Sequence, residues 1–147
     1  MSYVSPLDFF DSLMAAFTTY WADRTPISYP NKPFSPATLV GDDATAAWCR
    51  VFLAGDPAGQ TQYSNSAATD HFARSGQIVI ESYVREQSGS ALAYTLADAA
   101  LLFLQRKDVP DMIFQNISAP QETGSDGTWY QIAVSATWTY FTDRAAL

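Results

Sequence analysis

The spacing of apolar residues predicts two amphipathic helices, one near the start of the chain and one in its second half. Ser5 as N-cap and Pro6 in the first turn begin the first helix, which is expected to run to Ala22. The apolar face of this helix consists of Phe10, Leu13, Met14, Phe17 and Trp21. The second helix is expected to begin after Ser90, whose side chain is expected to cap it, and to end before Pro110. The buried face of this second helix is expected at Leu92, Leu96, Ala99, Ala100, Phe103 and Leu104.

Alternation of apolar and polar residues predicts four strands. The pattern is clearest near the end of the chain, where polar residues such as Ser135 and Thr137 alternate with large apolar ones. In the second strand Ile78 and Ile80 point one way, while Glu81 and Tyr83 point the other. The expected strands are Ala47–Ala54, Arg74–Arg85, Met112–Asn116 and Trp129–Tyr140.

This order of elements predicts one α+β domain over residues 1–147, with two helices packed on one face of a four-stranded, mostly antiparallel sheet. A chain of 147 residues with 48% hydrophobic content is long enough to bury one core. The expected core residues are Leu13, Phe17, Val51, Leu53, Ile78, Ile80, Leu96, Phe103, Ile132 and Val134.

Two segments outside these elements are unusual. Trp21–Pro36 carries four of the eight prolines among aromatic and apolar residues, so it is expected to form a stiff arm. Gly55–Phe72 is rich in small polar residues and is expected to form a long polar loop between two strands of a hairpin. The loop has few apolar groups of its own, so we expect it to be mobile in a free subunit and ordered in an assembly.

The charge balance is acidic. Fifteen Asp and Glu against eight Lys and Arg give a formal charge of −7, and the basic residues are scattered. This distribution argues against binding to the phosphates of nucleic acid, which requires clustered cations. The single cysteine, Cys49, lies in an apolar run and is expected to be a buried thiol without a disulfide partner. The start of the sequence lacks a charged segment followed by a long apolar one, so we expect no signal peptide, and no apolar run is long enough to cross a bilayer.

The residues that carry chemistry do not assemble into a known catalytic or metal-binding pattern. His71, the only histidine, follows Asp70, but no nucleophile motif accompanies it. The pair Asp42–Asp43 and the spaced pair Asp108 and Asp111 have too few ligands for calcium and are expected in solvated turns. We therefore expect no catalytic residues, no metal site and no cofactor.

Four segments of the chain carry a resemblance to a known family. The most specific are the arm motif TPISYPNKPF and the opening of the last strand, DGTWYQ, and the strand ARSGQIVIESYV and the helix ALAYTLADAALLFL add to the likeness. From about Leu7 to Phe141, the chain resembles the tail terminator proteins of long-tailed bacteriophages (the lambda-type tail terminator family).

The resemblance implies a structural virion protein with an α+β fold. Such proteins form a ring, expected to be a homohexamer, on the head-proximal end of the tail tube, where they stop tube growth. The implied partners are the tail tube protein and a head-completion or connector protein. DNA would pass through the ring without sequence-specific binding, and the protein would be assembled in the host cytoplasm.

Two sets of residues follow as candidate sites. A cyclic ring joins unlike surfaces head to tail, and the arm and the long loop are candidates for those surfaces. The expected interface residues are Tyr29, Asn31, Phe34, Tyr63, His71 and Phe72. An acidic lumen would repel DNA, and its candidates are Asp42, Asp43, Asp56, Asp70, Glu81 and Glu86.

Each of these hypotheses has an alternative. The arm rings of Tyr29 and Phe34 would serve equally to cap the core of their own domain, and the acidic residues would serve simply for solubility. The chain as a whole would also fit another head–tail connector, neck or tail tube protein. From a different class, a small-ligand-binding or enzymatic α+β domain would require a pocket in which His71 meets a carboxylate.

Overall fold

The computed structural model describes most of the chain. The described residues are 6–22, 24–30, 32, 34, 46–62, 71–86, 89–106, 112–125 and 128–143. For 6–8, 54–62, 71–73 and 141–143 the description covers the backbone alone.

Both predicted helices are present. α1 (Pro6–Trp21) ends one residue earlier than expected, and Leu13, Phe17 and Trp21 are fully buried. α3 (Ala91–Gln105) buries the expected Leu96, Ala100, Phe103 and Leu104, together with Ala93 and Ala97. Small alanines on the inward side let the helix approach the sheet closely.

Two expectations for the start of α3 are wrong. Leu92 is 37% exposed, because the buried stripe passes through Ala93 and Ala97 and leaves Leu92 on the flank of the first turn. The Ser90 side chain makes no capping hydrogen bond, since the residue has already adopted helical backbone angles.

The sheet is mixed and has six strands rather than the four that were expected. The α+β class is confirmed. In order, the strands along the sheet are β1–β2–β3–β6–β4, and β5 also pairs with β6. The bounds are β1 (Ile27–Ser28), β2 (Ala47–Gln62), β3 (His71–Arg85), β4 (Met112–Gln115), β5 (Gln121–Ser125) and β6 (Trp129–Asp143). All pairings are antiparallel except that of β1 with β2, which is parallel.

The two unpredicted strands have no alternating pattern to reveal them. β1 is two residues long and lies inside the proline-rich arm. Every residue of β5 is exposed, so hydrogen bonding to β6 alone defines it. β4 and β5 pair with successive parts of the same edge of β6, and between them the Ser135 backbone N–H donates to Ser118 Oγ at 2.9 Å.

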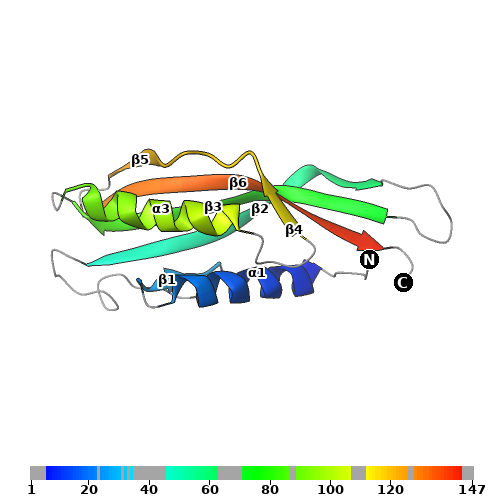
Figure 1. Ribbon diagram of the computed structural model, residues 1–147, viewed down its shortest axis with the longest axis horizontal. Helices are drawn as coiled ribbons and strands as arrows, with labels where there is room; N and C mark the ends of the chain where they lie inside the picture. Colours follow the sequence, from blue (N-terminus) through cyan, green and yellow to red (C-terminus); the bar gives the residue numbers. More distant parts are fainter. Residues whose placement is uncertain are drawn as a thin grey trace.

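The expected loop Gly55–Phe72 is largely strand, and this prediction is wrong at both ends. β2 continues to Gln62 and β3 begins at His71, with an irregular register between Gly55 and Gln60. Backbone groups form the ladder whatever the side chains are, so a polar sequence was no obstacle to pairing. Figure 1 shows this ribbon of β2, β3 and β6 continuing beyond the ends of both helices.

Both helices pack on one face of the sheet, as predicted. The inward positions of β2, β3 and β6 join residues of both helices in one hydrophobic core. Phe17 of α1 meets Phe103 of α3 edge to face at 5.1 Å between ring centres. All ten expected core residues contribute to this core, and only Leu53 is half-buried rather than buried.

Candidate functional site

The arm is attached to the sheet at its start. The indole N–H of Trp21 donates to Thr25 Oγ1 at 2.9 Å, and Thr25 Oγ1 donates to the Pro26 carbonyl oxygen at 2.9 Å. The same carbonyl accepts a bond from the Cys49 backbone N–H at 3.0 Å. These bonds bring β1 alongside β2 and determine where the arm leaves the domain.

The arm then passes from one face of the sheet to the other. Tyr29 packs against the helix-side core, and its hydroxyl is hydrogen-bonded to Thr18 Oγ1 of α1. Phe34 packs on the opposite face, with its ring centre 5.0 Å from that of Trp48. Both rings are half-buried against their own chain. These contacts favour the alternative that the two rings cap their own domain, and they leave an outward surface on each ring.

The opposite face carries a second, smaller core that the sequence analysis did not anticipate. Trp48 stacks on Tyr83 with ring centres 3.9 Å apart, and Trp129 meets Trp48 edge-on at 6.1 Å. All three rings are buried. Burial, followed by the nearby Glu81 carboxylate, raises the pKa of Tyr83 to about 12. The signal was available: three large aromatic side chains occupy positions on the nominally polar face.

A groove of about 490 Å³ runs between α1 and the arm. Its lining is mainly apolar and includes two charged residues, Asp11 and Lys32. The lining residues are Phe10, Asp11, Met14, Ala15, Thr18, Thr19, Tyr29, Pro30 and Lys32. The groove therefore does not bring His71 together with a carboxylate, which the ligand-binding or enzymatic alternative required.

The two candidate interface elements lie far apart. The arm ring Phe34 sits at the level of Tyr83 on β3, whereas His71 and Phe72 form the other end of the same strand. Tyr83 is twelve residue steps along the strand from His71, which corresponds to about 40 Å. Figure 1 shows the same arrangement, with β1 near one end of the long axis and the extended hairpin at the other. Asn31 and Tyr63 lie outside the described residues, and for His71 and Phe72 only the backbone is described.

The candidate acidic residues are described only in part. Glu81 lies on the face opposite the helices, 14% exposed, and its Oε1 is 3.8 Å from Nε of Arg50. Glu86 accepts a hydrogen bond from the Ser125 hydroxyl. Asp56 lies in β2 with its backbone alone described, and the remaining candidates, Asp42, Asp43 and Asp70, fall outside the described residues.

Cys49 has the surroundings of a structural thiol. The residue is fully buried on the helix side of β2. Burial raises its thiol pKa to about 12, and a hydrogen bond with Thr25 only partly offsets that effect. Within the described part of the chain, no three His, Cys, Asp or Glu side chains are close enough together to hold a metal ion. No helix in that part is long and apolar enough to span a membrane.

Comparison with known proteins shows the fold and no more. No family model matches the chain, and no curated protein matches it. Among solved structures, one whose name states no function is 17% identical, with a TM-score of 0.52. The match covers 89% of this chain and 94% of the other. At this identity the likeness extends to the α+β architecture alone.

Proposed function

We propose that this chain is a structural virion protein, a tail terminator that forms a ring on the head-proximal end of a phage tail tube. In this role it stops tube polymerisation and offers the attachment surface for the head or its connector. The sequence motifs of the arm and of the last strand support the proposal, and an α+β domain is compatible with it.

The observation that carries the proposal is the separation of the arm from the extended hairpin. A cyclic ring needs two unlike surfaces on each subunit, placed so that one meets the other on the next copy. The arm and the hairpin occupy opposite ends of one continuous sheet, about 40 Å apart. An element at each end of a stiff sheet suits head-to-tail contact between copies, and a ring is built from such contacts.

The test is to add the purified protein to tail tube protein while tubes are growing, and to image the products by negative-stain electron microscopy. We expect shorter tubes, each with a ring at one end, and a tube length that falls as more protein is added. Thr95→Ala, on the exposed side of α3, is the matched control and should behave like the unaltered chain. Tubes of unchanged length without rings would contradict the proposal, and binding only to head connectors would favour a neck protein instead.

A further inference from the structure

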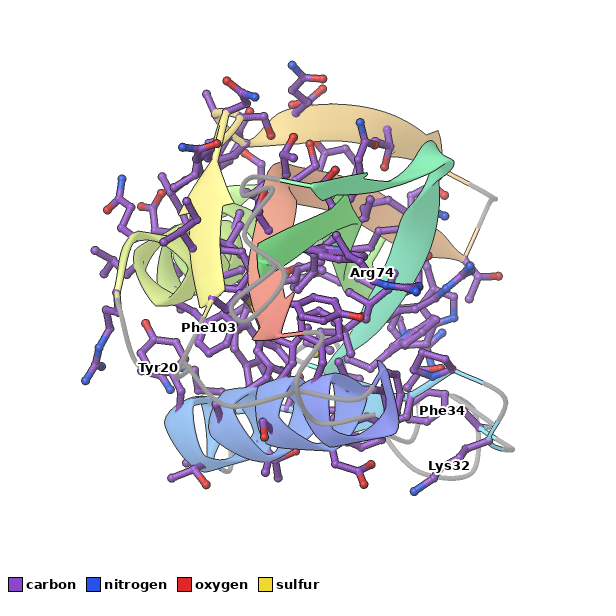
Figure 2. The ribbon with its side chains drawn as sticks, turned by 90° about the vertical axis from the view of Figure 1, so that its right-hand side faces the viewer. Tyr20, Lys32, Phe34, Arg74 and Phe103 are labelled. Atoms are coloured by element: carbon purple, nitrogen blue, oxygen red, sulfur yellow. The ribbon has the colours of Figure 1, made fainter. Side chains whose placement is uncertain are left out.

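Two arginines converge on one tyrosine ring where the C-terminal ends of the two helices meet. The guanidinium carbon of Arg24 lies 5.0 Å from the centre of the Tyr20 ring, and that of Arg106 lies 5.2 Å from it. The Tyr20 ring is held in place, because its hydroxyl donates to the Ala99 carbonyl oxygen at 2.8 Å and its face packs on Phe103 at 5.4 Å. Figure 2 shows Tyr20 and Phe103 together between the helices, on the opposite side of the view from Lys32 and Phe34.

An exposed leucine lies beside these charges. Leu102 is 54% exposed, the highest value among the exposed large hydrophobic residues in the described part of the chain, and it precedes Arg106 by one helical turn. We call Tyr20, Arg24, Leu102 and Arg106 the arginine patch. Tyrosine and arginine beside an apolar side chain are the composition typical of the strongest contacts in protein interfaces.

Arg24 is positioned to bind a further acceptor. It donates from Nη1 to the carbonyl oxygens of Tyr20 at 2.7 Å and Trp21 at 3.1 Å, which fixes the side chain over the end of α1. Nε and Nη2 take no part in those bonds. A guanidinium held in this way loses little freedom when it binds a carboxylate.

This concentration of positive charge is unusual for the chain. Only eight basic residues oppose fifteen acidic ones. Copies that each carry a charge of −7 repel one another, and a contact that places cations of one copy against carboxylates of the next offsets that repulsion locally.

We propose that the arginine patch is a subunit contact that binds carboxylates of a second copy of this chain. The proposal rests on the proposed ring and adds a further contact to its interface, formed by the start of the arm and the end of α3, apart from Tyr29, Phe34 and the hairpin. The acidic excess of the chain supplies the complementary partner, and Leu102 supplies apolar area that the contact would remove from water. Guanidinium–carboxylate pairs at the contact make assembly sensitive to salt.

The test compares assembly of the full chain and of Arg24→Gln/Arg106→Gln by sedimentation velocity and mass photometry. We expect the double variant to assemble at least about tenfold more weakly, since the loss of one charge-assisted bond already contributes roughly that factor. Raising NaCl from about 0.1 to about 1 M should weaken assembly of the unaltered chain and affect the variant less, because the Debye length falls from about 10 to about 3 Å. Arg50→Gln, which removes the same charge from the other face, is the matched control.

Thermal unfolding of dilute samples separates folding from assembly, because Arg24 also caps α1. If the double variant assembles weakly but unfolds at nearly the same temperature as Arg50→Gln, the result supports the proposed patch. If the double variant assembles as well as the unaltered chain, or if Arg50→Gln weakens assembly equally, the proposal of the arginine patch is wrong. The proposal of a ring is not affected by either result. An unaltered chain that stays monomeric at every concentration overturns both the ring and the patch.

Discussion

The hydroxyl of Ser82 is expected to destabilise the fold, so replacing Ser82 by alanine should stabilise it. Ser82 lies in the middle of β3 on the helix side and is fully buried, with Cys49 and Ile132 as its neighbours on the adjacent strands. Among the residues that the structure describes, its Oγ has no hydrogen-bond partner. Folding therefore removes this hydroxyl from water without replacing the hydrogen bonds it made there.

The magnitude follows from two opposing terms. An unsatisfied buried hydroxyl costs about 1–3 kcal/mol, whereas the small void left by one oxygen atom costs less than about 1 kcal/mol. Ser82→Ala should therefore raise the free energy of unfolding by about 1 kcal/mol. For a chain of this length, that gain corresponds to a rise of about 3 °C in Tm.

Urea unfolding followed by tryptophan fluorescence measures the change, and the m-value should stay constant while the midpoint rises. Ser135→Ala is the matched control, since the Ser135 hydroxyl donates to Ser118 Oγ at 3.2 Å in a half-buried position on β6. This control should lose about 0.5–1.5 kcal/mol. A loss of stability in Ser82→Ala would refute the reasoning and indicate that the hydroxyl has a partner, such as a bound water.

Three further predictions concern the two cores. Ile80→Ala should lower the free energy of unfolding by about 2–5 kcal/mol, because the side chain is fully buried beneath the helices; a loss below about 1 kcal/mol would contradict its place in the core. The Cys49 thiol, with its pKa raised from 9.0 to about 12, should resist thiol reagents at pH 9 until the chain unfolds. The same shift in pKa stabilises the fold below pH 9, and this stabilisation is lost as the pH rises toward 12, which urea midpoints measured over a pH series would detect. Phe34→Ala should lower monomer stability by about 1–3 kcal/mol through lost stacking on Trp48, measured by thermal unfolding; unchanged stability with impaired ring assembly would show instead that the ring of Phe34 contacts a partner.

The helices, the main strands and the principal core follow from the sequence, because each depends on a regular spacing of apolar residues along the chain. α1 and α3 show apolar residues at helical spacing, and β6 alternates over most of its length. Once those faces are known, burial follows, since each face must leave water and the only large apolar surfaces available are those of the other elements. That is why all ten predicted core residues contribute to one hydrophobic core.

Elements without a regular spacing of apolar residues were decided by the tertiary structure alone. β1 and β5 exist because neighbouring strands offer unpaired backbone groups, and the hairpin continues through polar residues for the same reason. Among the candidate site residues, the sequence named Tyr29 and Phe34 but not the faces they occupy, which depend on how the arm crosses the edge of the sheet. The meeting of Arg24 and Arg106 at one ring joins residues 82 positions apart, and only the packing of α1 against α3 brings them together.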